Sequence, residues 1–246
     1  MQPMTRLKAS GLHLVISLLV GSVLFAMFWF VWYPAPMLTS IGGSEIFLVV
    51  VAIDIVLGPL LTLVVFKHGK PSLKFDLTII VLMQIAAMAY GVFTLFEARP
   101  VFVAALDGEF QVVQAPEVSE ANLTKANVKL PLWGPVWVGT KAPDNPYDME
   151  EVKDAVIAGA GRGHFPHLHV AYESVQGRVL SHAKQIKALK NGDAKRSSEV
   201  DQWLRRRGYD DKSAVFLPIR ISASLLVVML DARTGKVIGI APFVPL

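Results

Sequence analysis

Residues 11–33 read GLHLVISLLVGSVLFAMFWFVWY, a stretch of apolar character that contains no charged side chain. Two further stretches of similar length, residues 44–66 and 76–96, are also mostly apolar. A helix needs about 20 mostly apolar residues to cross the hydrocarbon core of a bilayer, and each stretch reaches that length. The sequence therefore predicts a membrane protein whose first domain, residues 1–97, is a bundle of three transmembrane helices.

The overall composition agrees with insertion into a membrane. Apolar residues make up 53% of the chain and charged residues only 18%, which is too apolar for a fully soluble domain. The 24 Lys and Arg residues exceed the 20 Asp and Glu residues by only four, so a nucleic-acid-binding surface is not indicated. The chain has no cysteine, which excludes disulfides, cysteine nucleophiles and thiolate metal sites.

A cleaved signal peptide is the alternative interpretation of the first apolar stretch, because Arg6 and Lys8 precede it. The apolar region of a secretory signal is about 7–15 residues long and ends at a site of small residues. This stretch is longer and ends in Trp29, Trp32 and Tyr33, aromatic residues typical of the membrane interface. We therefore expect a retained helix.

The short loops predict the orientation of the three helices. Two basic residues, Arg6 and Lys8, precede the first helix, and three more, Lys67, Lys70 and Lys74, lie between the second and third helices. Residues 34–43, between the first and second helices, include no basic residue. Because Lys and Arg in short loops favour the cytoplasmic side, we expect a cytoplasmic N-terminus in the bacterial inner membrane. Three spans then place the second domain, residues 98–246, in the periplasm.

Asp54 lies near the middle of the second predicted helix, where an Asp costs about 2.5–3.5 kcal/mol on insertion scales. At 1.5 Å per residue, Ser22 and Gln84 lie at a similar depth and are its candidate partners. Gly58 and Pro59 follow within about one turn, and Pro59 predicts a kink because it cannot donate a hydrogen bond to the carbonyl of Ile55. Two interpretations remain open: a contact or proton site, or a polar clip that holds the helices together.

The remainder of the chain predicts one α+β domain with an antiparallel sheet. The Asp107-Gly108 pair between residues 101–106 and 109–114 is a strong hairpin signal. A capping-box pattern, Asp148 with Glu151, predicts a helix from residue 148 to 160. The other elements expected are helices at 173–190 and 198–207, strands at 214–221, 224–231 and 236–242, and an ordered Pro-rich loop at 130–146.

Three histidines, His164, His167 and His169, invite a metal-site interpretation. Pro166 prevents a helix that would align them, and no acidic or cysteine ligand lies within the run. We therefore expect no metal or other cofactor.

Gly159, Gly161 and Gly163 follow a predicted helix instead of joining a strand to a helix, so they predict a helix end and a loop and not a phosphate-binding site. The chain also lacks the motifs of serine hydrolases, zinc proteases and P-loop enzymes. The sequence therefore predicts a protein that is not an enzyme.

The membrane half resembles the TfpX/TfpZ family of type IV pilin accessory proteins. The similarity is carried by RLKASGLHLVISLLV (6–20), FVWYPAP (30–36), DIVLGPLLTLVVFKHGKPSLKFDL (54–77), Gln84, Tyr90-Gly91 and ARPV (98–101), and more weakly by LDARTGKVIGIAPF (230–243). The resemblance implies an inner-membrane helper of pilin stability, presentation or pilus assembly, with pilin and other assembly components as partners. It brings no catalytic residues.

Two other functions remain possible on sequence grounds. One is a membrane-anchored periplasmic sensor or small-ligand-binding module with a pocket near Trp133, Trp137 and the histidines. The other is a small proton-coupled membrane enzyme that uses Asp54. A pilin waiting in the bilayer has an apolar helix and a periplasmic head, so an accessory protein with both a membrane and a periplasmic domain suits it best.

Overall fold

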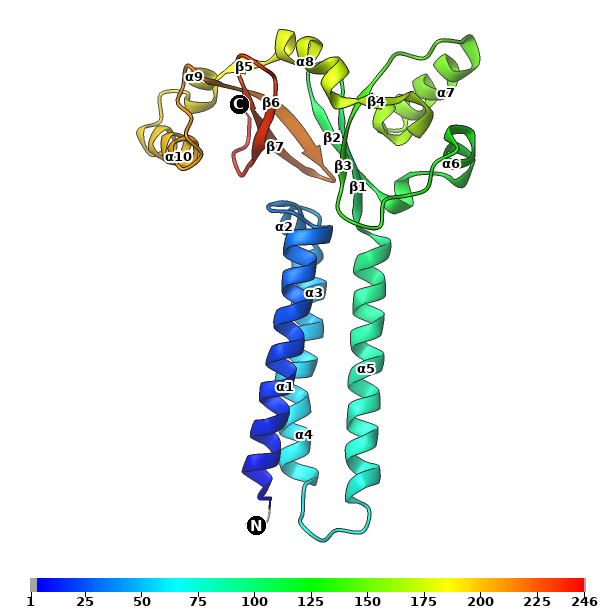
Figure 1. Cartoon of the computed structure of the whole chain (residues 1–246), viewed down its shortest axis with the longest axis vertical. Helices are drawn as coiled ribbons and strands as arrows, with labels where there is room; N and C mark the ends of the chain where they lie inside the picture. The colour runs from blue at the N-terminus through cyan, green and yellow to red at the C-terminus, as the bar shows by residue number, and fades with distance from the viewer. Residues whose placement is uncertain (1–3, 246) are drawn as a thin grey trace. The chain divides into compact units, whose positions relative to one another are not determined.

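A computed structural model describes residues 4–245, and residues 1–3 and 246, at the outer ends of the two predicted domains, lie outside it (Figure 1). The chain divides into two compact units. The first, the helical unit, contains Met1–Pro34 and Gly42–Ala98, and the second, the sheet unit, contains Ala35–Ile41 and Arg99–Leu246. The short segment between the first two long helices, with helix α2 (Met37–Ser40), is thus part of the sheet unit.

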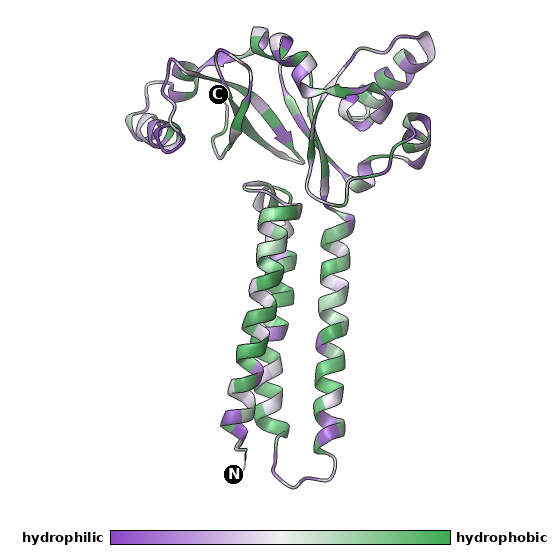
Figure 2. Ribbon diagram, viewed as in Figure 1, coloured by the Kyte–Doolittle hydropathy of each residue, from purple (hydrophilic) through white to green (hydrophobic). Residues whose placement is uncertain are grey.

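Three helices of the helical unit are long and apolar enough to cross a membrane, as their predominantly green colour in Figure 2 indicates. They are Arg6–Trp32, comprising α1 (Arg6–Met27) and a π-helical turn; Gly43–Val65, comprising α3 (Gly43–Ala52), a π-helical turn and α4 (Gly58–Val65); and α5 (Leu73–Glu97). The prediction of three apolar helices is confirmed. The first begins earlier than expected, where the Thr5 side chain accepts a hydrogen bond from the Lys8 N–H.

Near Pro59, where the sequence predicts a kink, the structure has a π-helical turn over Ile53–Leu57. Pro59 has no N–H, so the regular hydrogen-bond ladder cannot continue through it. The Gly58 N–H bonds the carbonyl of Ile53, five residues earlier, which widens the turn. Asp54 lies inside this turn, and such π-helical turns occur frequently at functional sites.

The second helix lies between the other two, with α1 packed on α4 and α5 packed on both α3 and α4. Helices α3 and α5 approach closely at Gly91, where an added Cβ would lie 2.1 Å from Val50 Cγ2. Aromatic rings fill one end of this unit, and the Trp32 and Phe96 ring centroids are 5.0 Å apart. Trp32 and Tyr33, expected at a lipid interface, are instead buried in the protein.

The sheet unit is built on eight strands in the order β4-β3-β1-β2-β6-β7-β8, with β5 paired to β6. The strands are β1 (Pro100–Ala105), β2 (Phe110–Gln114), β3 (Val136–Thr140), β4 (His169–Ala171), β5 (Lys184–Gln185), β6 (Ala214–Ile221), β7 (Ser224–Asp231) and β8 (Val237–Ala241). The helices are α6 (Glu120–Ala126), α7 (Pro146–Ile157), α8 (Gln176–His182), α9 (Ile186–Lys190) and α10 (Ala194–Arg205).

The prediction of an antiparallel sheet is wrong, because the sheet is mixed and curled. The β1–β2 hairpin is antiparallel, as expected, and its turn uses Gly108 at φ +95°. However, β1 pairs in parallel with β3, and β2 pairs in parallel with β6 over only two residue pairs. The parallel strand β3 lies inside the stretch 130–146 that was expected to be a loop.

Two helix predictions also need correction. The helix expected at residues 173–190 is broken into a 3-10 turn, α8, the short strand β5 and α9. The helix expected to begin at Asp148 begins at Pro146, because the side chain of Asn145 caps it by accepting the Asp148 N–H at 2.8 Å. The expected helix at 198–207 is α10, which begins four residues earlier.

The core of the sheet unit includes two clusters of buried apolar side chains. One cluster packs α9 and α10 on β6, β7 and β8, with Leu189, Leu204, Phe216 and Met229 buried in it. The second cluster packs the segment after β2 on β1, β2 and β3. The hairpin and the three C-terminal strands thus supply most of the buried apolar surface.

Candidate functional site

A cavity of about 370 Å³ lies within the helical unit and is lined by residues of α1, the second helix and α5. Its wall is almost entirely apolar. The polar residues that line it are few: His13, Ser17, Asp54, Thr62 and Gln84. Because apolar surroundings strengthen each hydrogen bond and penalise each unpaired polar group, the partners of these side chains define the site.

Asp54 and Gln84 form the central polar pair of the cavity. Gln84 Nε2 donates to Asp54 Oδ1 at 2.9 Å and also lies 3.4 Å from the Asp54 carbonyl oxygen. Gln84 is buried at 9% exposure, and Asp54 is half-buried. Ser22, the other candidate partner, lies elsewhere: its Oγ donates to the carbonyl of Leu18 in its own helix, and its side chain is exposed.

A second polar pair, His13 and Thr62, lines the same cavity. His13 Nδ1 and Thr62 Oγ1 are 2.7 Å apart, and Thr62 is only 3% exposed. Nearby, Ser10 Oγ donates to the carbonyl of Pro59 at 2.9 Å. The polar side chains of α1 therefore attach it to α4, the part of the second helix that follows the π-helical turn.

Gly58 allows the two polar pairs to approach each other. A Cβ added at Gly58 would lie 2.3 Å from Gln84 Nε2 and 2.9 Å from His13 Nε2, too close for either side chain to keep its place. Asp54, Gly58 and Thr62 are spaced by four residues and so lie along one face of the second helix. That spacing is the signal in the sequence that identifies Thr62, which the candidate residues of the sequence analysis did not include.

The cavity offers a ligand one further hydrogen-bond acceptor. Gln84 occupies Oδ1 of Asp54, and a carboxylate can accept hydrogen bonds through both oxygens. Oδ2 can therefore accept a further donor from a ligand. The apolar walls favour an apolar ligand, so the best occupant is an apolar segment that carries a single hydrogen-bond donor.

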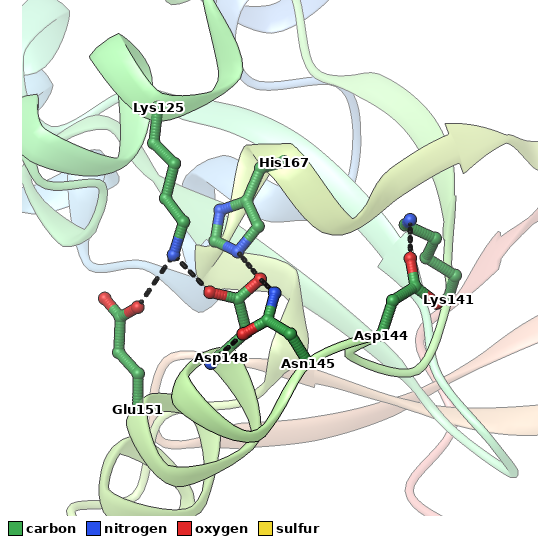
Figure 3. Close-up of polar contacts among 7 residues, drawn as sticks. All are labelled: Lys125, Lys141, Asp144, Asn145, Asp148, Glu151 and His167. Carbon is green, nitrogen blue, oxygen red and sulfur yellow. Dashed lines mark hydrogen bonds and ion pairs between the residues drawn. The ribbon is translucent and has the colours of Figure 1, made fainter.

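The histidine run belongs to the sheet unit, and its three members face different partners. His164 Nε2 lies 3.8 Å from Glu117 Oε2, and His169 Nε2 lies 2.9 Å from the carbonyl oxygen of Gly163. His167 Nε2 lies 3.5 Å from Asp148 Oδ2, as Figure 3 shows. Among residues 4–245, no group of three or more His, Cys, Asp or Glu side chains is arranged to hold a metal ion.

Asp148 is the centre of a charged cluster that joins α6 to α7. Lys125 Nζ lies 2.5 Å from Asp148 Oδ1 and 3.1 Å from Glu151 Oε2 (Figure 3). The hydrogen bond from Lys125 is the main reason that the pKa of Asp148 is lowered, and it outweighs the opposing effect of burial. The carboxylate of Asp148 also accepts a hydrogen bond from the Asn145 side chain. Asp148 and Glu151, which the sequence analysis interpreted as a capping box, therefore bind Lys125 and connect α7 to α6.

The histidine pKa values shift in opposite directions. Burial opposes protonation of His164, but the hydrogen bond with Glu117 and the contact with Gly161 together raise its pKa. Burial lowers the pKa of His169, since its single backbone acceptor does not compensate. The acidic partner of His164 lies about 50 residues away in the sequence, which is why inspection of the run alone could not find it.

The residues suggested to line a sensor pocket contact different neighbours. The Trp137 ring packs edge-on against Phe110 at 5.7 Å, and the His169 ring packs against Phe102 at 4.7 Å. Trp133 is exposed to solvent over 74% of its surface. Gly159, at φ +88°, follows α7 and ends it, in agreement with the expected helix end.

Comparison with known proteins relates most of the chain to fimbrial assembly proteins. The family model described as fimbrial assembly protein FimB matches residues 2–42. The fimbrial assembly protein of serogroup I from Dichelobacter nodosus is 27% identical over 231 residues, which cover 91% of this chain and 90% of that protein. No solved structure matches the chain.

A second relative has a higher identity over a shorter stretch. The fimbrial assembly protein of serogroups C1 and C2 from Dichelobacter nodosus is 36% identical over 98 residues, which cover 39% of this chain and 75% of that protein. Identity at this level over most of a relative's length, together with the match to the family model, shows common descent. The chain therefore belongs to the FimB family of fimbrial assembly proteins.

Proposed function

We propose that the protein is an inner-membrane accessory factor of type IV fimbrial biogenesis that associates with a pilin and assists its stability, presentation or assembly. The observation that carries this proposal is the similarity to fimbrial assembly proteins over 91% of the chain. The more specific resemblance to type IV pilin accessory proteins, set out from the sequence, supplies the pilin as partner. The three apolar helices, each long enough to cross a bilayer, support the membrane location.

The cavity of the helical unit is the proposed contact for the apolar helix of the pilin. Its walls are apolar, and Asp54 gives it one hydrogen-bond acceptor beyond the one that Gln84 uses. In a bilayer, helices associate through close packing and interhelical hydrogen bonds, because lipid tails are as apolar as the side chains. An apolar helix with one donor at the depth of Asp54 meets both requirements.

Photo-crosslinking from the native membrane tests this contact. Val81 and Ile85 of α5 line the cavity and are 46% and 50% exposed, whereas Met83 is 67% exposed and lies on another face of the same helix. We expect a photoreactive residue at position 81 or 85 to crosslink to pilin, and the same residue at position 83 to crosslink mainly to lipid. Equal pilin crosslinking at all three positions, or none at any, would contradict the proposal.

The proposed topology has a cytoplasmic N-terminus and a periplasmic sheet unit, and reporter fusions test it. The basic residues of the N-terminus and of the loop before α5 are the reason for this orientation. We expect alkaline phosphatase fused after residue 246 to be active and a cytoplasmic reporter at the same point to be inactive. The reverse pattern would show that the sheet unit is cytoplasmic.

A further inference from the structure

The loop between α6 and β3 exposes a large aromatic side chain. Trp133 is 74% exposed, and Gly134 after it adopts φ +59°, a left-handed conformation that turns the chain sharply there. Two apolar neighbours in the sequence, Val128 and Val136, are also 44% and 45% exposed. A tryptophan offers a large apolar surface and one polar N–H, so its exposure to water alone is unfavourable.

Arg99 fixes this loop to the beginning of the sheet unit. Its guanidinium donates to the carbonyl of Pro131 twice, from Nε at 3.2 Å and from Nη2 at 3.0 Å. Arg99 itself is only 5% exposed, so its side chain is held in one arrangement. The backbone two residues before Trp133 is therefore attached to Arg99, the first residue of the longer segment of the sheet unit.

Chain length places Arg99 near the surface of the bilayer that α5 is proposed to cross. Residues 77–96 contain no charged side chain, and 20 helical residues are about 30 Å long, which equals the thickness of the hydrocarbon core. Glu97, the last residue of α5, then lies at the level of the lipid headgroups. Arg99 follows by two residues, which span at most about 7 Å.

We infer that Trp133 inserts into the headgroup region of the bilayer and anchors the sheet unit to the membrane surface. Tryptophan is enriched at this depth because its ring is apolar and its N–H can bond water or lipid carbonyls. The partner is the lipid interface on the side where α5 ends, and Val128 and Val136 add apolar area to the same contact. The inference rests on the proposed membrane span of α5.

Depth-dependent fluorescence quenching tests the anchor on the full chain. Because the natural sequence has no cysteine, a single Trp133→Cys substitution carries one environment-sensitive label without competing sites. Ile157→Cys is the matched control, since Ile157 of the same unit is 76% exposed. Phe93→Cys, 62% exposed on α5, reports the span itself. The labelled proteins are reconstituted into phosphatidylcholine–phosphatidylglycerol vesicles that contain a lipid with a nitroxide near the headgroup.

We expect the lipid nitroxide to quench the label at 133 several-fold more than the label at 157, and aqueous iodide to show the opposite order. Strong lipid quenching at 93 with none at 133 would overturn the anchor and leave the span intact. Absence of lipid quenching at 93 would overturn the span and the anchor together. Equal lipid quenching at 133 and 157 would show that the label itself partitions and would also overturn the inference.

A second variant tests Trp133 without replacing it by the label. Val136→Cys is labelled in chains that either keep Trp133 or carry Trp133→Ser. We expect lipid quenching at position 136 to fall when the tryptophan is removed, because the loop then lacks its main apolar contact. Unchanged quenching at position 136 would overturn the role of Trp133.

Discussion

Replacement of Asp54 by leucine is expected to reduce surface fimbriae strongly, and Asp54→Asn should reduce them too while leaving the membrane level of the protein near wild type. Asparagine keeps an oxygen that can accept from Gln84 Nε2, and leucine does not, but the asparagine amide nitrogen that replaces Oδ2 cannot accept from a pilin donor. Loss of this hydrogen bond costs about 0.6–2 kcal/mol of helix packing. It also leaves the buried amide of Gln84 with only its long, 3.4 Å contact to the backbone carbonyl of residue 54, at up to about 1–3 kcal/mol more. Counts of surface fimbriae and immunoblots of the membrane fraction measure both effects.

The double variant Asp54→Leu/Gln84→Leu separates packing from function. Replacement of both partners by apolar groups removes the unpaired amide, so the membrane level of the double variant should exceed that of Asp54→Leu alone. Normal protein level with normal fimbriae would identify the pair as a polar clip. Normal level without fimbriae, or failure of Asp54→Asn, would assign Asp54 a direct contact with the pilin and contradict the clip. Wild-type fimbriae for Asp54→Leu would contradict both roles.

Gly91→Ala is expected to destabilise the helical unit markedly, whereas Gly21→Ala should have little effect. The new Cβ at position 91 would lie 2.1 Å from Val50 Cγ2, and valine is stiff about χ1, so α3 and α5 must separate. Such overpacking costs about 1–3 kcal/mol and sometimes more. At position 21 the nearest atom, Ile55 Cδ1, is 3.8 Å away, an ordinary contact.

Thermal unfolding of the two purified variants in the same detergent measures this difference. Both substitutions replace glycine by alanine within a long helix, so the change in intrinsic helix propensity is the same for both. A lower Tm for Gly91→Ala than for Gly21→Ala is the expected result. Equal Tm values would mean that Val50 can move away freely and that the close approach of α3 and α5 is not needed.

The elements that the sequence predicted well are those that local chemistry determines. Three long apolar runs allowed only helices of membrane-spanning length. The Asp107-Gly108 turn specified the β1–β2 hairpin, since Gly108 at φ +95° closes it. The strands β6 and β7 were predicted with the bounds that the structure shows, because a short turn joins two apolar runs.

The elements that the sequence did not predict depend on contacts between distant residues. Strand β3 lies among prolines, and its parallel pairing with β1 is a property of the tertiary fold. The 173–190 stretch has helical character throughout, yet residues Lys184–Gln185 pair with β6 and interrupt it. Tertiary pairing therefore overrides local propensity at both places.

The candidate site was predictable in part. Gln84 was predicted as a partner of Asp54 because a rise of 1.5 Å per residue puts both side chains at a similar depth in their helices. The hydrogen bond between them confirms that prediction. Depth alone does not fix the direction in which a side chain points, so Ser22 faces away and bonds its own helix. The pairing of His13 with Thr62 required the packing of α1 on α4, which the sequence alone does not give.

The assignment of Ala35–Ile41 to the sheet unit means that the chain passes between the two units three times, after Pro34, after Ile41 and after Ala98. A unit joined to its neighbour by a single covalent connection can rotate about it. A unit joined by three connections is mechanically coupled to every helix end at which a connection begins or ends. Met37 and Leu38, 1% and 3% exposed, fill part of the sheet unit, and Ser40 accepts a hydrogen bond from Ser224. A fragment that starts at Arg99 would lack these buried side chains. Because the chain joins the sheet unit to all three long helices, a force applied to that unit reaches the first two helices as well as the third.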